Sequence, residues 1–465
     1  MSPADTFAPL SPLVDDEVSG PLTVVPFEVP GLGNRTYIAS GDCYAVLVDP
    51  PRDVDSLLGF AADRGWTITH VVETHIHNDY VSGGLAVARR TGAEYVVPAD
   101  TDVAFHARQI TDGEEFAVGP GTMRAVHTPG HTPTSMSFLL RTSAGDVAVF
   151  TGGGLLYGGV GRTDLFGPDL AEGLARDQWA SARKLESLSG PGAVVLPTHG
   201  FGSFCSVGDS DFGDRTIAGL KLTNPVFREE QDLFVDRLLG QQGPFPSYFD
   251  QMGSLNREGT PQADLARPVI ETLAQIAARA EAGEWVLDLR HRHAFADAHL
   301  PHTLSFDAAS AYVTYIGWLI PWGADVHVIV PDELLLRTAV IELARIGIES
   351  VRSAAFWKDG SLDTSAMDVF QHADGRRLRA ALADDPVLPV LDVRLPSESS
   401  RARLAGEFAV PVHELAARME EVRAWSAGRT VWVYCASGFR SAVAASMLER
   451  AGIPAVHVDG SVVDS

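Results

Sequence analysis

The stretch VVETHIHNDYVSG, residues 71–83, passes from an apolar run directly into a polar loop. The loop carries two histidines two positions apart, His75 and His77, and then Asp79. A chain that leaves a buried strand and enters such a loop is typical of a sheet-based α/β scaffold, in which loops at strand ends carry the function. The stretch therefore predicts both the fold class and the position of a site.

Two later loops repeat this design. TPGHTP, residues 128–133, holds His131 in a tight turn, and LPTHG, residues 196–200, places His199 directly after an apolar run. A lone histidine in a turn is usually a capping or core residue. Imidazoles from several strand-end loops, however, can converge on one cation, and neutral imidazole suits zinc or iron. The three loops together predict a metal site.

The surrounding residues, from about 21 to 200, alternate short β-branched runs with turn signals and helical stretches. Short β-branched runs predict strands, and they fall at residues 45–48, 70–72, 95–97 and 147–150. From residue 213 to 265 the pattern changes to helix and loop, and the turn-rich segment 240–261 is expected to be a bridge to the rest of the chain.

The last two hundred residues contain an internal repeat. WVLDLR at 285–290 returns as VLDVR at 390–394, and DVHVIV at 325–330 returns as TVWVYC at 430–435. One nearly constant offset across strand, loop and helix indicates two copies of one α/β unit, each with a mainly parallel sheet. We expect these copies at residues 266–372 and 376–465.

Only the second copy carries a cysteine at its loop. CASGFR runs from Cys435 to Arg440 between an apolar strand and a helix, so loop N–H groups and the helix N-terminus favour a thiolate or persulfide there. A buried structural cysteine is the plainer alternative. A phosphatase loop would need five residues between cysteine and arginine. The first copy has no cysteine, and Asp332 and Glu333 at its loop would oppose an anionic sulfur.

Composition limits the classes of partner. Lys+Arg 36 against Asp+Glu 60 gives a formal charge of −24, which repels phosphate backbones, so we expect no nucleic-acid binding. The apolar stretch at 312–330 is broken by Pro321 and Asp325, so we expect no membrane span. Three distant cysteines form no disulfide framework, and Cys43 is expected to pack inside a strand. The N-terminus lacks the pattern of a signal peptide, and we expect a cytoplasmic protein.

The motifs THIHND, TPGHT, GRTDL and PTHG resemble the metallo-β-lactamase fold, and within it the glyoxalase II and persulfide dioxygenase branch. This resemblance covers residues 20–255 and implies an αββα sandwich there. In the dioxygenases of that branch two histidines and an aspartate hold one iron, and the matching positions here are His75, His131 and Gly153. The two-zinc hydrolases use further ligands, which match His77, Asp79 and Tyr80.

Two of these positions depart from the family. Gly153 stands where a carboxylate is usual, and Tyr80 stands where the hydrolases have histidine. We therefore expect one Fe(II) or Zn(II) on His75, His77 and His131, with His199 beside them, although a domain without metal stays open. Asp79 would orient a ligand or act as a base.

Other matched positions have two interpretations each. Arg162 could orient an anionic substrate, while Asp164 is expected to hold its loop. HGFGSFC, residues 199–205, resembles a segment of dioxygenases fused to rhodaneses, so Cys205 is either a catalytic thiol at the pocket mouth or an inert buried one. CASGFR resembles single-domain rhodaneses. The first copy resembles an inactive rhodanese, with His299 in a structural turn.

The resemblance implies an enzyme that oxidises a low-molecular-weight thiol persulfide to sulfite and moves sulfane sulfur between thiol, sulfite and thiosulfate through Cys435. A glyoxalase II-like thioester hydrolase is one alternative. Another is a scaffold around a single sulfurtransferase domain. A β-lactamase is the least favoured. The sequence is compatible with a homo-oligomer.

Overall fold

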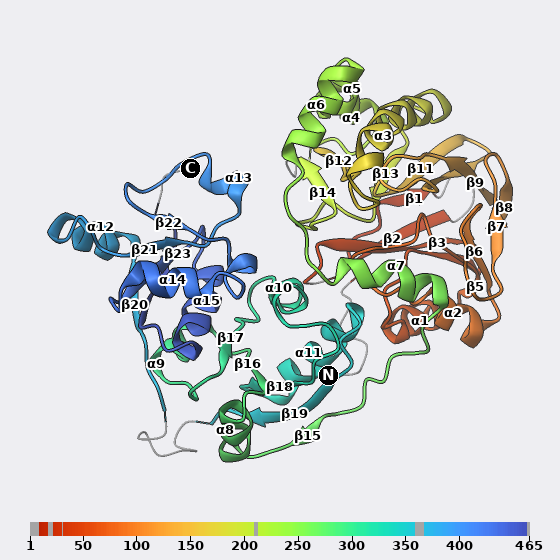
Figure 1. Ribbon diagram of the computed structural model, residues 1–465. Helices are drawn as coiled ribbons and strands as arrows, with labels where there is room; N and C mark the ends of the chain where they lie inside the picture. The colour runs from red at the N-terminus through yellow and green to blue at the C-terminus, as the bar shows by residue number, and fades with distance from the viewer. Residues whose placement is uncertain (1–8, 17–21, 30, 209–212, 359–366, 463–465) are drawn as a thin grey trace. The chain divides into compact units, whose positions relative to one another are not determined.

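The computed structural model describes residues 9–16, 22–29, 31–208, 213–358 and 367–462 (Figure 1). The chain divides into two compact units: residues 1–264 with the short segment 344–347, and the remainder of 265–465. Most of the N-terminal stretch on which the signal-peptide expectation rests lies outside the described residues. No helix of the described part is long and apolar enough to cross a bilayer.

Two sheets form the first unit, and both are listed here in spatial order. The seven-stranded sheet holds β1 Val14–Asp16, β2 Leu22–Val29, β3 Asn34–Gly41, β4 Tyr44–Val48, β5 Thr67–Val72, β6 Glu94–Pro98 and β7 Arg108–Ile110. The five-stranded sheet holds β13 Val194–Pro197, β11 Gly145–Gly152, β10 Met136–Thr142, β9 Gly121–His127 and β8 Glu115–Val118. A short pair joins β12 Gly159–Gly161 to β14 Ser206–Gly208.

The core lies between these sheets, where Val46, Phe138 and Phe150 are fully buried. Helices cover the outer faces (Figure 1). They are α1 Asp55–Asp63, α2 Gly84–Thr91, α3 Pro168–Leu188, α4 Ile217–Thr223, α5 Pro225–Arg228, α6 Gln231–Gln241 and α7 Phe249–Glu258. This is the expected αββα sandwich, and all four predicted strands are present as β4, β5, β6 and β11.

Two local predictions in this unit are wrong. The segment 240–261 is not only a bridge, because it contains α7, whose buried residues Phe249, Met252 and Asn256 recur at helical spacing. Cys43 does not pack inside a strand. It lies exposed in the two-residue turn between β3 and β4, directly after Asp42, whose φ is 55°.

The second unit contains two five-stranded parallel sheets with the same strand order. The first sheet runs β15 Val269–Ile270, β19 Val351–Phe356, β18 Val326–Val330, β16 Trp285–Asp288 and β17 Leu304–Ser305. The second runs β20 Gln371–Asp374, β24 Ala455–Asp459, β23 Val431–Tyr434, β21 Val390–Asp392 and β22 Phe408–Ala409. The identical order confirms the internal repeat. Because β20 pairs with β24, the second sheet already begins at Gln371.

Helices connect the parallel strands of each copy, as right-handed crossovers require. In the first copy they are α8 Leu273–Glu281, α9 Arg292–Asp297, α10 Tyr312–Leu319 and α11 Glu333–Arg345. In the second they are α12 Gly375–Asp384, α13 Pro396–Ser399, α14 Met419–Ser426 and α15 Phe439–Arg450, with a 3-10 turn at Val412–Glu414. The interrupted apolar stretch at 312–330 is accounted for by α10 and β18.

Candidate functional sites

Three buried histidines converge at the strand ends of the first unit. One ring nitrogen each of His75, His131 and His199 lies within 4.8 Å of the other two. The Nε2 atoms of His75 and His199 face each other at 3.2 Å. The structure thus brings together the histidines of all three loops that the sequence singled out.

The other ring nitrogen of each histidine is fixed by a separate neighbour. The Nδ1 atom of His75 lies 2.9 Å from the Thr74 hydroxyl, that of His131 lies 2.8 Å from the Arg162 carbonyl oxygen, and that of His199 lies 2.9 Å from Asn34 Oδ1. These contacts leave every Nε2 directed at the centre of the cluster. Partners of this kind set the ring orientation of metal ligands.

The electrostatics keep two of these rings neutral. Burial, together with the charges of neighbouring histidines, lowers the pKa of His75 well below its usual range and that of His131 to about 3. Neutral imidazole is the form that binds metal. The residues fit one ion, because His131 Nε2 is buried with no hydrogen-bond partner among the described residues. Metal–nitrogen bonds of about 2.0–2.1 Å would also place two ligand nitrogens of a tetrahedral site roughly 3.3 Å apart.

His77 does not join this trio. Its Nε2 lies 3.2 Å from Asp49 Oδ1 and 3.1 Å from Glu73 Oε2, and all three side chains are buried. Burial lowers the pKa of His77, but the two carboxylates outweigh it and raise the value to about 10. The sequence grouped His77 with His75 and His131. In the structure the His77 and His75 rings lie 4.2 Å apart, but the ligand atoms of His77 group with Asp79 and His199 and with Asp49 and Glu73.

Asp79 lies next to the trio and orients one of its members. Its Oδ2 accepts a 2.7 Å hydrogen bond from the Asn34 amide and lies 3.3 Å from His199 Nδ1. Burial raises the pKa of Asp79, but the interactions with His199, His77 and Asn34 together outweigh it and leave the pKa lowered. His77, Asp79 and His199 form a second group of potential ligand atoms within 4.8 Å.

The two departures from the family have physical counterparts in the structure. A Cβ atom on Gly153 would lie only 2.2 Å from the His131 ring, so that ring occupies the space that a side chain at 153 would need. The Tyr80 hydroxyl donates to the Asp49 carbonyl oxygen at 3.1 Å, and its ring stacks on His77. Neither position offers a metal ligand, so the donor set of a dinuclear hydrolase is incomplete.

Sequence reasoning missed the buried polar residues behind the histidines. Asp49 follows β4 with φ of 50° and accepts hydrogen bonds from the backbone N–H and hydroxyl of Thr74, each at 2.7 Å, and from the Thr198 hydroxyl. It therefore ties together the loops that carry His75 and His199. The only available signal was an Asp-Pro pair directly after an apolar strand.

Arg162 is anchored inside the protein. It forms a two-pronged ion pair with Asp164 at 2.7 and 2.8 Å and donates to the Gly243 carbonyl oxygen at 2.6 Å. These bonds favour a role for Arg162 in holding its loop over a role in orienting a substrate. Cys205 is also buried, and burial followed by the charge of Asp79 raises the pKa of its thiol well above the usual range. Cys205 is therefore a buried thiol and does not lie at an exposed pocket mouth.

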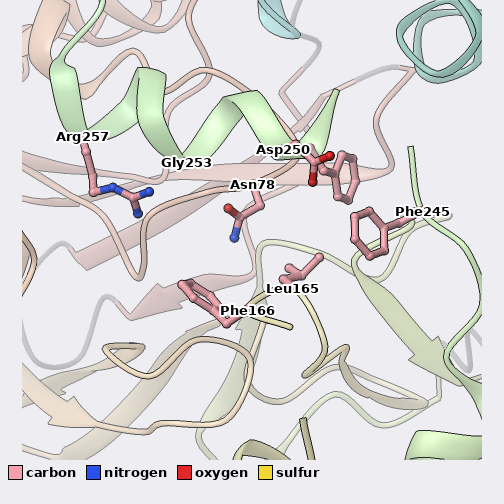
Figure 2. Close-up of a pocket in the computed structure, with 8 residues that line it drawn as sticks. Asn78, Leu165, Phe166, Phe245, Asp250, Gly253 and Arg257 are labelled. Carbon is pink, nitrogen blue, oxygen red and sulfur yellow. The ribbon is translucent and has the colours of Figure 1, made fainter. Parts of the chain in front are cut away.

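A pocket of about 190 Å³ borders the histidine loop (Figure 2). Asn78, which lies between His77 and Asp79 in the histidine loop, lines one side of the pocket, and α7 contributes Asp250 and Arg257. The remaining lining side chains are apolar or aromatic: Leu165, Phe166, Phe245 and Phe249. An acidic and a basic side chain beside an apolar wall suit a small ligand that carries both a positive and a negative charge.

The second unit contains the cysteine loop. Cys435 directly follows β23, and its Sγ accepts a 3.1 Å hydrogen bond from the Gly438 backbone N–H at the start of α15. The Ser441 hydroxyl lies 3.6 Å from the same sulfur. A buried sulfur that meets the Gly438 backbone N–H and a helix N-terminus is placed to hold negative charge.

Arg440, at the end of this loop, is held by one carboxylate. Its guanidinium makes a two-pronged ion pair with Glu398 at 2.5 and 2.7 Å. Burial lowers the pKa of Arg440, but Glu398 more than offsets this and raises it. In the first copy β18 ends at Val330 without a cysteine, and Asp332 is exposed at the equivalent loop.

Comparisons with known proteins agree with this architecture. Residues 29–199 match the metallo-β-lactamase superfamily and residues 375–464 match the rhodanese-like domain. Hydroxyacylglutathione hydrolase of Rhizobium etli is 32% identical over 155 residues, which cover 33% of this chain and 56% of that protein. The Rhodospirillum rubrum hydroxyacylglutathione hydrolase is 33% identical over 152 residues, covering 32% and 54%. The chain thus spans about half the length of these curated relatives.

One solved structure is similar over a longer stretch. A metallo-β-lactamase from Staphylococcus aureus subsp. aureus COL has 26% sequence identity and a TM-score of 0.64, and the alignment covers 72% of this chain and 99% of that one. That share exceeds the first unit, so the likeness extends into the second. The chain therefore combines a domain of the metallo-β-lactamase fold with a rhodanese-like domain.

Proposed function

We propose that this chain is an enzyme of sulfur metabolism, in which Cys435 carries sulfane sulfur and the first unit acts on a low-molecular-weight thiol persulfide with one bound Fe(II) or Zn(II). The observation that carries the proposal is the environment of Cys435, whose sulfur accepts a backbone N–H bond at the start of α15. A persulfide on that sulfur is anionic at neutral pH, and the same N–H group stabilises it.

Sulfur transfer at this loop needs only nucleophilic displacement. The Cys435 thiolate attacks the sulfane sulfur of a persulfide or of thiosulfate. The donor's S–S bond breaks, and the donor's thiol or sulfite leaves with the electron pair. Cys435 then holds the sulfur as a persulfide until a thiol, sulfite or cyanide takes it and restores the thiolate.

In the first unit His75, His131 and His199 would hold the metal, and Asp79 would keep His199 oriented. A bound ion supplies Lewis acidity and, if it is iron, the redox chemistry that activates O2. The proposed net reaction combines one persulfide, one O2 and one water to give the thiol, sulfite and two protons. Tethering the two units raises the effective concentration of one activity's product at the other.

A thioester hydrolase is the second candidate, favoured by the hydroxyacylglutathione hydrolases among the relatives. Gly153 and Tyr80 count against it, because they leave out ligands of a two-zinc site. A third candidate treats the first unit as a scaffold without metal around a single sulfurtransferase.

Elemental analysis and an oxygen electrode separate the three. The proposal predicts about one metal per chain and O2 uptake that depends on added glutathione persulfide. Thioester turnover without O2 uptake would support the hydrolase, and absence of metal after reconstitution would support the scaffold. Stoichiometric metal with no O2 uptake from any thiol persulfide would contradict the dioxygenase assignment.

A further inference from the structure

The pocket beside the histidine loop holds one charge of each sign in its lining (Figure 2). Both charged residues, Asp250 and Arg257, belong to α7 and are seven positions apart, so they share one face of the helix. Gly253 lies between them on that face and also lines the pocket. The pocket volume of about 190 Å³ is smaller than the roughly 300–1,000 Å³ that drug-sized ligands need. It therefore suits a molecule of the size of one amino acid.

Two hydrogen-bond donors meet over Gly253 without a partner. A Cβ atom on Gly253 would lie 2.9 Å from Asn78 Oδ1 and 3.4 Å from Arg257 Nη2, so both side chains lie against the same bare stretch of α7. The Asn78 Nδ2 atom is buried and has no hydrogen-bond partner among the described residues. Within the same residues the Arg257 guanidinium has no ion-pair partner. These two groups therefore offer their N–H donors to a ligand.

Helix α7 is fixed to the histidine loop by one buried side chain. The Asn256 amide donates to the carbonyl oxygens of His77 and Tyr80, at 2.8 Å each. Asn78 belongs to the same loop, where it stands between His77 and Asp79, and it also lines the pocket. A molecule held in the pocket is thus held next to the loop that carries the metal-site residues.

The polar groups of the lining match those of a single α-amino acid. Arg257 and Asn78 can donate together to one carboxylate, and the Asp250 carboxylate can accept from an ammonium group. The aromatic and aliphatic wall can pack against a methylene group and a sulfur atom. Glutathione carries a second carboxylate, and a nucleotide-linked thiol carries several phosphate charges. The described lining has one cation, Arg257, so it does not balance the charge of either of these larger carriers.

We propose that this pocket binds the amino-acid end of the thiol carrier, and that the carrier is a free amino-acid thiol such as cysteine. The carboxylate of the substrate bonds to Arg257 and Asn78, its ammonium group bonds to Asp250, and its sulfur is directed toward the histidine trio. An amino acid without sulfur carries the same two charged groups, and kinetics separate such an effector from a substrate. The inference rests on the proposed action of the first unit on a thiol persulfide.

Calorimetric binding of S-methylcysteine to the full-length protein tests the pocket without any reaction, because the methyl group replaces the outer sulfur of the persulfide. Arg257→Met and Asp250→Asn should each weaken binding about tenfold or more. The methyl ester of S-methylcysteine has no carboxylate, so Arg257→Met should leave the affinity for the ester unchanged. The matched control is Glu258→Gln, which removes an exposed charge of α7 outside the pocket and should bind S-methylcysteine like the unaltered protein.

Oxygen uptake by the metal-loaded protein separates a substrate from an effector. With cysteine persulfide, Arg257→Met should raise KM about tenfold and keep kcat within about twofold, because Arg257 holds the end of the molecule that does not react. A lowered kcat with an unchanged KM would show an effector site and overturn the proposal. Tighter binding of S-methylglutathione than of S-methylcysteine would overturn it as well, because the carrier would then be the larger thiol.

The remaining outcomes separate the pocket from the function on which the inference rests. Absence of S-methylcysteine binding, or equal affinity in the unaltered protein, Arg257→Met and Asp250→Asn, would overturn the pocket assignment even if O2 uptake with a thiol persulfide is found. Binding as expected in a protein that consumes no O2 with any thiol persulfide would support the amino-acid site and refute the dioxygenase function.

Discussion

The histidine trio and the cysteine loop are both built where β-strands end, but they are assembled in opposite ways. Cys435 and Arg440 belong to one short strand–loop–helix segment, so chain connectivity sets their spacing. The three histidines come from loops on two different sheets, and each ring needs its own hydrogen-bond partner to point inward. The cysteine loop therefore depends on local sequence, whereas the histidine trio depends on how the two sheets pack.

The largest expected effect is at the local site. Cys435→Ser should abolish thiosulfate:cyanide sulfurtransfer, a loss of at least about a thousandfold, because it removes the nucleophilic sulfur of the loop. Cys43→Ser is the matched control, since that thiol lies exposed in a turn of the first unit. Initial rates with both variants measure this directly. Residual sulfur transfer by Cys435→Ser above the rate without protein would contradict the role of Cys435 as the sulfur carrier.

In the histidine site, substitution of a metal ligand should lower metal affinity more than substitution of a neighbouring histidine. His131→Ala should lower metal affinity at least about a hundredfold, because it removes one of three ligands. His77→Gln should keep the affinity within about tenfold and lower the melting temperature instead, since it leaves Asp49 and Glu73 without their cation. Metal titration with calorimetry decides between them. A larger loss of affinity in His77→Gln than in His131→Ala would restore the grouping predicted from sequence.

Gly153→Asp tests whether the missing carboxylate can be put back. The new Cβ atom would meet the His131 ring, so we expect a loss of about 1–3 kcal/mol of stability and no second metal. Gly153→Ala adds the same Cβ without the charge and should lose a similar amount. Denaturant unfolding together with metal analysis checks both. Two metals per chain in Gly153→Asp would contradict the account of this position.

The smallest expected effect concerns His457, whose Nε2 lies 2.9 Å from the Gly438 carbonyl oxygen of the cysteine loop. Burial lowers the pKa of His457 to about 4, so between pH 6.5 and 4 the unfolded chain binds more protons than the folded one. Its contribution to stability is complete above about pH 6.5 and is lost as the pH falls. His457→Gln should reduce the dependence of unfolding free energy on pH by up to about 1.4 kcal/mol per pH unit in that range. An unchanged dependence would contradict this assignment.

The same contrast explains how much the sequence could predict. The Cys435 loop was predicted residue by residue, because its strand, its spacing to Arg440 and its helix are adjacent in the chain. The repeat was predicted for the same reason, since a constant offset preserves the order of strands and helices. The histidine loops were also found, because each directly follows an apolar strand.

The grouping inside the metal site could not be predicted in this way. Which histidines face one another depends on Asp49 and Glu73, which capture His77, and on Asn34, which orients His199. Asn34 begins β3, whereas Asp49 and Glu73 directly follow β4 and β5, so the packing of these strands decides which histidine each residue meets. The helix α7 was missed because its apolar spacing is hidden among glycines and prolines.

The most direct test of the central claim is mass spectrometry of the full-length protein after incubation with glutathione persulfide. We expect one added sulfur atom on the peptide that contains Cys435, and its removal when cyanide is added. Added sulfur found only on Cys43 or Cys205, or none at all on Cys435 while transfer proceeds, would contradict it.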